Sequence, residues 1–138
     1  MAVIGVDYLQ LMRSHSKQAA NSREREVAEI SSGLKALAKE LKVPVVVLAQ
    51  LNRGPETRAG KEAGIPRMSD LRESGSIEQD ADIVMFLYRD AYYNKDSPTP
   101  NISECIVAKN RHGETGTVKL MWDGQFTRFS NAEMRDEG

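Results

Sequence analysis

The chain has 138 residues, of which 40% are hydrophobic and 28% are charged, a composition typical of one soluble globular domain with its own core. Its formal net charge of −1 excludes a protein that binds nucleic acid through overall positive charge, although a local basic surface remains compatible with it. The single cysteine, Cys105, excludes an internal disulfide and no apolar run has membrane-spanning length, so we expect a cytoplasmic protein.

The first half of the sequence predicts a strand, a helix and a second strand. The apolar runs at residues 3–6 and 45–49 each stop at a polar residue, which is typical of parallel strands buried on both faces. Between them, Asn21 or Ser22 is expected to cap a helix, with Glu24 completing a capping box, and Pro44 to end it. Apolar residues at helical spacing predict its core-facing stripe: Val27, Ile30, Leu34, Leu37, Ala38 and Leu41.

The polar residues that end these two strands form the first candidate site. Ligands of open α/β sheets bind beyond the carboxyl ends of parallel strands, so Asp7 and Gln50 are expected to share one crevice. A carboxylate beside an amide suits a hydrated magnesium ion next to a terminal phosphate. The alternative is that Asp7 only begins a turn and Gln50 is a solvated loop residue.

The second half predicts loops and further strands. Residues 54–67 are interrupted by glycine and proline, predicting a mobile loop, and residues 69–82 predict a turn and a short helix. Strands are expected at 83–88, fully buried, at 104–109, and around 118–122 before an Asp123-Gly124 hairpin turn, with an irregular segment at 90–103. The fold class is therefore α/β, beginning as a parallel sheet flanked by helices and ending in antiparallel strands.

Two further groups of residues could contact phosphate. Lys109 and Arg111 lie two residues apart, and on an extended segment both would point to the same side and reach one triphosphate. The alternative is a pair of exposed basic side chains. The segment from Asp70 to Gly75 offers backbone N–H groups and Arg72 to a phosphate backbone, or is simply the entry to a helix. Gly60-Lys61 does not fit a phosphate-binding loop, because Glu62 follows the lysine.

Taken together and in this order, four motifs resemble bacterial DnaB-type replicative helicases. They are Asp7-Tyr8-Leu9-Gln10-Leu11-Met12, Ala49-Gln50-Leu51-Asn52-Arg53, the block Ser69–Asp82, and Lys109-Asn110-Arg111-His112-Gly113. Residues 92–97, Tyr-Tyr-Asn-Lys-Asp-Ser, are similar to the same family. The resemblance covers residues 1–138 and implies the second half of a RecA-like motor domain. The family's phosphate-binding loop, catalytic glutamate and amino-terminal domain have no counterpart, and the sequence opens abruptly on a strand, so we expect a fragment.

The resemblance implies a role for each candidate residue. Asp7 is similar to the Walker B aspartate, which acts on Mg²⁺, and Gln50 to the residue that links the terminal phosphate of ATP to the DNA-binding loops. Arg72, Glu73 and Gly75 resemble the loop that grips single-stranded DNA, with the basic residues of 53–67 as a second candidate. Lys109 and Arg111 resemble the pair inserted into the neighbouring subunit's site, Arg111 being the arginine finger.

At the level of the whole protein, the resemblance implies a homo-hexameric, ATP-driven helicase that moves 5′ to 3′ on single-stranded DNA, with a primase and a helicase loader as partners. We expect the fragment alone to be inactive. Two alternatives remain open: a non-catalytic module that contributes DNA affinity or oligomer contacts, and a related RecA-like ATPase of recombination or signalling.

Overall fold

The computed structural model describes residues 1–17, 19–71 and 75–132. Although the length fits one domain, the chain divides into two compact units. The first comprises Met1–Asn52 and Met68–Ala81, and the second comprises Arg53–Arg67 with the described residues from Asp82 onward. None of the described helices is long and apolar enough to cross a membrane.

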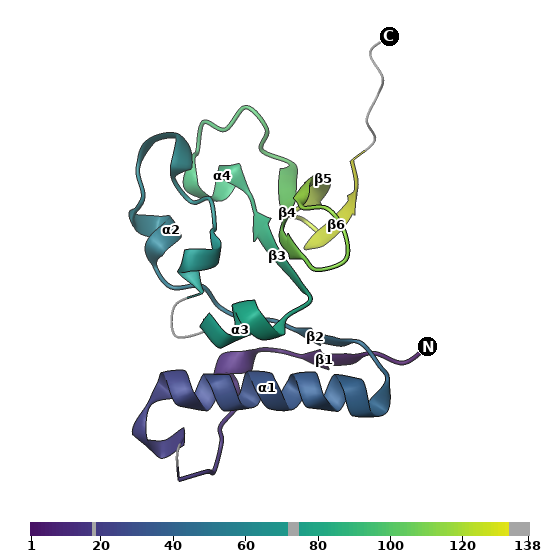
Figure 1. The fold of residues 1–138 in the computed structure, drawn as a ribbon. Helices are drawn as coiled ribbons and strands as arrows, with labels where there is room; N and C mark the ends of the chain where they lie inside the picture. The colour runs from purple at the N-terminus through teal and green to yellow at the C-terminus, as the bar shows by residue number, and fades with distance from the viewer. Residues whose placement is uncertain (18, 72–74, 133–138) are drawn as a thin grey trace. The chain divides into compact units, whose positions relative to one another are not determined.

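The first unit is built on two parallel strands and the helix that connects them. Strand β1 (Ile4–Val6) pairs with β2 (Val45–Val47), and the register runs from Ile4 opposite Val45 to Val6 opposite Val47. Helix α1 (Arg23–Leu41) runs alongside both strands (Figure 1). The other described elements are short: η1 (Leu9–Leu11), η2 (Ala19–Asn21), η4 (Met68–Asp70) and α3 (Gly75–Asp80).

The core of this unit lies where α1 packs on the segment that follows β1. Leu9, Val27 and Ile30 are buried, and the residues that pack against them are Met12, Leu34, Val47 and Ile77. The predicted apolar stripe is therefore confirmed at its beginning but wrong at its end, because Leu41 is 51% exposed. A helix of 19 residues spans about 28 Å, whereas a three-residue strand spans only about 10 Å, so two such strands cannot cover all of it.

The start of α1 confirms one of the two predicted caps, whereas the capping box differs from the prediction. Ser22 is the N-cap, and its hydroxyl accepts a hydrogen bond from the Arg25 backbone N–H. The predicted capping box is wrong, because a cap at Ser22 places Arg25, and not Glu24, at the third helical position. The last helical residue is Leu41, and Lys42 already adopts a left-handed conformation with φ of 52°. The helix therefore ends before Val43, the residue that Pro44 restricts.

The second unit is built on a four-stranded antiparallel meander, in which neighbouring strands follow one another in the chain. Its elements are α2 (Gly54–Thr57), η3 (Gly60–Glu62), β3 (Ile83–Tyr88), α4 (Asp90–Tyr93), β4 (Ile102–Asn110), β5 (Gly116–Asp123) and β6 (Arg128–Asn131). The predicted strands of this half are thus confirmed, but residues 54–67 and 90–93 contain short helices where a loop and an irregular segment were predicted. The hairpin turn after Asp123 has four residues, 124–127.

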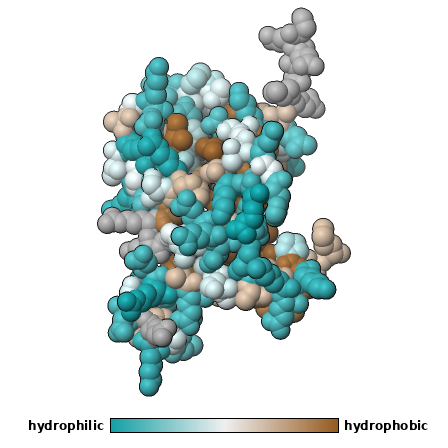
Figure 2. All heavy atoms as spheres, viewed as in Figure 1, coloured by the Kyte–Doolittle hydropathy of each residue, from teal (hydrophilic) through white to brown (hydrophobic). Residues whose placement is uncertain are grey.

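Strand β3 is not buried on both faces as predicted. Val84, Phe86 and Tyr88 are buried, whereas the alternate side chains Ile83, Met85 and Leu87 are 52–62% exposed. The middle residues of β1 and β2 are exposed as well. A run of apolar residues predicts a strand but does not reveal how many of its faces are covered. On the face seen in Figure 2, hydrophobic groups form small patches between hydrophilic side chains.

Candidate functional site

Asp7 and Gln50 leave the same edge of the parallel sheet. The ladder continues past the paired residues Val6 and Val47, because the Leu48 N–H donates to the Val6 carbonyl at 2.9 Å and the Leu9 N–H donates to the Leu48 carbonyl at 2.8 Å. Asp7 follows β1 directly, and Gln50 follows β2 by three residues. Both residues are exposed. This is the edge of an α/β sheet at which ligands bind.

A side chain from η1 joins the two strand ends. The Gln10 Nε2 donates to the Gln50 carbonyl at 3.0 Å, and the Gln50 backbone N–H donates to the Gln10 Oε1 at 3.1 Å. One amide thus satisfies both backbone groups of a residue 40 positions away. In the sequence, Gln10 was noted only as part of the motif that begins at Asp7, and no contact with Gln50 was predicted. Its position three residues after Asp7 was the available signal, but it did not reveal the contact.

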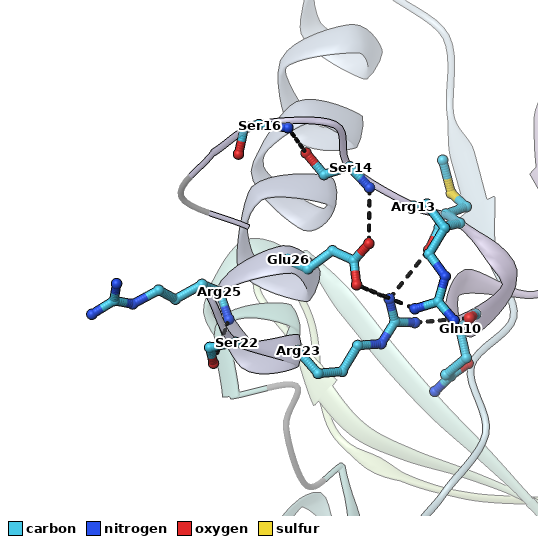
Figure 3. Close-up of polar contacts among 9 residues, drawn as sticks. Gln10, Arg13, Ser14, Ser16, Ser22, Arg23, Arg25 and Glu26 are labelled. Carbon is cyan, nitrogen blue, oxygen red and sulfur yellow. Dashed lines mark hydrogen bonds and ion pairs between the residues drawn. The ribbon is translucent and has the colours of Figure 1, made fainter. Parts of the chain in front are cut away.

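A charged cluster holds the segment after β1 against α1 (Figure 3). The buried Glu26 carboxylate accepts hydrogen bonds from Arg23, from the Ser14 N–H at 2.9 Å and from Arg13 at 3.3 Å. Arg23 also donates to the Gln10 carbonyl at 2.8 Å and to the Met12 carbonyl at 3.2 Å. The Arg23 hydrogen bond, followed by that of Ser14, lowers the pKa of Glu26 and keeps it ionised.

The carboxylate of Asp7 fits one kind of metal. No group of three His, Cys, Asp or Glu side chains among the described residues could enclose an ion. Mg²⁺ does not require such a cage, because it keeps several waters and is commonly held by one or two carboxylates together with substrate phosphates. A single exposed carboxylate at the carboxyl end of β1 meets that requirement.

Lys109 and Arg111 lie in the second unit at the end of β4. Lys109 belongs to the strand and is half-buried, opposite Val84 of β3. Arg111 begins the turn to β5, so the expectation that both side chains project from one extended segment does not apply to it. Its guanidinium forms an ion pair with Asp82 at 3.2 Å, and its side chain is 42% exposed.

Two of the three residues predicted to grip DNA, Arg72 and Glu73, lie outside the described residues. Gly75 is the first residue of α3, and a Cβ built on it would meet no atom within 4 Å. In the second candidate, residues 53–67, basic side chains contact their own segment: Arg67 pairs with Glu62, and Arg58 donates to the Ile65 carbonyl.

The sequence of this chain matches a known protein family. The family model of the DnaB-like helicase C terminal domain matches residues 1–131. The chain belongs to this family. Its fold is accordingly a partial RecA-like α/β fold, in which the parallel pair β1–β2 and the antiparallel sheet β3–β6 follow one another in the chain.

Individual members of the DnaB-like helicase family are similar over nearly the whole chain. The replicative DNA helicase DnaB of Geobacillus stearothermophilus is 55% identical over 98% of this chain, and that of Pasteurella multocida is 56% identical over 99%. One solved structure, described as an ATPase domain, has a TM-score of 0.88 and 46% identity over 95% of this chain and 44% of its own. A DnaB-like replicative helicase studied for its interactions with primase has a TM-score of 0.86 and 45% identity.

The chain matches only part of each of these proteins. It spans 29% of the Geobacillus stearothermophilus helicase and 28% of the Pasteurella multocida helicase. Of the DnaB-like helicase studied with primase it covers 31%.

Proposed function

We propose that this chain forms the C-terminal part of the motor domain of a hexameric, ATP-dependent replicative DNA helicase. The observation that carries the proposal is the position of Asp7 and Gln50 at one carboxyl edge of the β1–β2 sheet, in a chain that belongs to the DnaB-like helicase family. A cytoplasmic location fits this role.

Asp7 and Gln50 divide the chemistry of the nucleotide site between them. Asp7 would hold Mg²⁺, and the ion would supply positive charge to neutralise the phosphates of bound ATP. The side-chain N–H of Gln50 donates a hydrogen bond to the terminal phosphate or to the attacking water. Gln50 lies on the connection that leaves β2, at the start of the segment that leads to the DNA-binding loops. Loss of the terminal phosphate therefore removes a contact of Gln50 at the start of that segment.

Lys109 and Arg111 serve the nucleotide of the neighbouring subunit. A cation supplied in trans stabilises the charge that develops during phosphoryl transfer, an effect worth about a thousandfold or more in rate. The partial exposure of Arg111 on the turn after β4 supports this role. Asp82 would orient the guanidinium when no neighbouring phosphate is present.

The whole protein would move 5′ to 3′ along single-stranded DNA. Arg72, Glu73 and Gly75 would grip its phosphate backbone, and the basic residues of 53–67 are the second candidate contact. The primase named in the description of one similar helicase supports a primase as a partner, and a helicase loader is the second partner we propose. The 138 residues contain no Gly-Lys-Ser/Thr phosphate-binding pattern, so the isolated chain should not hydrolyse ATP.

Exchange of segments with a relative tests this function. In the Geobacillus stearothermophilus helicase, residues 1–131 of this chain replace the matching segment, and DNA-stimulated ATP hydrolysis is measured. The unmutated chimaera should be active, and Asp7→Asn and Arg111→Ala should each abolish hydrolysis. Full activity of the Asp7→Asn chimaera would overturn the proposal.

Mixed rings test whether Arg111 acts in trans. A ring that contains Asp7→Asn and Arg111→Ala subunits places an intact Asp7 beside an intact Arg111 at some interfaces. An equal mixture should recover activity at about a quarter of the interfaces if the subunits assemble at random and the two residues belong to different subunits. No recovery in verified mixed hexamers would place both residues in the site of one subunit.

A further inference from the structure

We infer that Gln10 is a positioning residue that fixes the backbone of Gln50 in the nucleotide site. This inference rests on the proposed function, since it concerns how Gln50 is held and not whether Gln50 contacts phosphate. The observation behind it is the pair of hydrogen bonds, at 3.0 and 3.1 Å, between one side-chain amide and both backbone groups of Gln50.

The geometry explains why a side chain is needed at this point. The backbone ladder between the two strands reaches Leu48, whose N–H and carbonyl both bond to the β1 side. Beyond Leu9 the chain turns into η1 and no longer runs beside β2. The backbone groups of Gln50 lie past the end of β2 and past Leu48, which bonds to the β1 side. Gln10 replaces the missing strand there, because its Oε1 and Nε2 satisfy the backbone N–H and carbonyl of Gln50 that a neighbouring strand would otherwise bond.

Gln10 is itself held on both sides. Leu9, the preceding residue, is 1% exposed and belongs to the core. The Gln10 carbonyl accepts a hydrogen bond from Arg23 of α1 at 2.8 Å, and Arg23 is bound in turn to Glu26 (Figure 3). A continuous series of contacts therefore leads from α1 through Arg23 and Gln10 to Gln50. Held in this way, the Gln50 side chain starts from a fixed backbone when it meets a phosphate.

Amide hydrogen exchange in the 138-residue chain tests the contact itself. Gln10→Met keeps the length of the side chain but removes its donor and acceptor. The Gln50 N–H should then exchange faster, while the Leu48 N–H, bonded to the Val6 carbonyl, should exchange as before. Equal acceleration at Leu48 and Gln50 would mean that the substitution only loosens the unit, and would overturn the inference. Gln125→Met, in the exposed turn before β6, is the matched control and should change neither amide.

Kinetics of the chimaeric helicase test the consequence. Gln10→Met should lower kcat by about tenfold or more, the scale on which supporting residues act through another group, with little change in KM for ATP. An unchanged kcat in the Gln10→Met ring, with activity abolished by Asp7→Asn, would overturn this inference and leave the proposed function standing. An active Asp7→Asn ring would instead overturn the proposed function.

Discussion

The Arg111 guanidinium lies 3.2 Å from the Asp82 carboxylate, and the Arg111 backbone N–H donates to the Asp82 carbonyl at 2.9 Å. The two side chains are 42% and 52% exposed. Exposed ion pairs contribute little, so Arg111→Ala should lower the free energy of unfolding by less than about 1 kcal/mol. Urea denaturation of the 138-residue chain measures this. A loss several times larger would mean that inactivity of the Arg111→Ala ring reflects unfolding.

The Glu26 cluster makes the first unit sensitive to acid. Hydrogen bonds from Arg23 and Ser14 lower the pKa of Glu26 below its ordinary value of 4.5. A carboxyl group with a lowered folded pKa stabilises the fold fully above its unfolded pKa, and this contribution is lost as the pH falls from 4.5 through the folded value. We therefore expect the urea concentration at the unfolding midpoint to decrease as the pH is lowered through that range.

The substitution Glu26→Gln should remove this acid dependence and lower stability at neutral pH, since Arg23 and Arg13 then lose their charged partner. Glu24→Gln, at an exposed position in the same helical turn, is the matched control and should retain the acid dependence. The same midpoint-against-pH curve for Glu26→Gln and the unmutated chain would contradict this assignment.

Tyr88 makes the second unit sensitive to alkali. Burial first, and then the hydrogen bond to Asp90 at 3.0 Å, raise the pKa of Tyr88 from 10.0 to about 12. Because the folded state disfavours the ionised phenol, stability should be complete below pH 10.0 and should decline as the pH rises toward 12. The difference in tyrosinate absorbance between the unmutated chain and Tyr88→Phe measures this pKa. Titration of Tyr88 at its ordinary pKa would show that the phenol is accessible to water.

The sequence predicted the strands better than their surroundings. An apolar run such as residues 83–88 favours a strand because β-branched and aromatic side chains fit an extended backbone, and β3 occupies those residues. The same run could not reveal that Ile83, Met85 and Leu87 would be exposed, because the number of covered faces depends on which elements pack there. Cys105, which lies in the apolar run of β4, is likewise only half-buried.

The candidate site was predictable in its outline and not in its contacts. The abrupt ends of two apolar runs led to Asp7 and Gln50, because a strand pattern fixes where its carboxyl end lies. The Gln10 amide contact depends on how η1 turns after β1, and no local pattern encodes that turn. The ion pair of Arg111 with Asp82 depends on the pairing of β3 with β4, a contact between distant parts of the chain.

Gly64 should tolerate substitution less well than Gly60. Both have a positive φ, 75° and 74°, which costs about 1–2 kcal/mol for a residue with a side chain. A Cβ at Gly64 would in addition lie 2.3 Å from the Tyr93 ring, whereas a Cβ at Gly60 would meet no atom within 4 Å. Gly64→Ala should therefore lower the free energy of unfolding clearly more than Gly60→Ala. Equal losses in urea denaturation would mean that the Tyr93 ring moves aside freely.

Gly33 is the position at which substitution should stabilise the chain. It lies in the interior of α1, is exposed, and has open space where a Cβ would be added. Alanine favours a helix interior by about 1 kcal/mol over glycine, partly because it restricts the unfolded chain, so Gly33→Ala should raise the free energy of unfolding by about that amount. Gly5→Ala, which also meets no atom but lies in β1, is the control and should gain less, because alanine favours strands only weakly. If Gly33→Ala gave no gain, the carboxyl-terminal half of α1 would have to unfold separately from the core around Val27 and Ile30. A helical segment that unfolds on its own does not add its helix propensity to the free energy of unfolding measured for the whole unit.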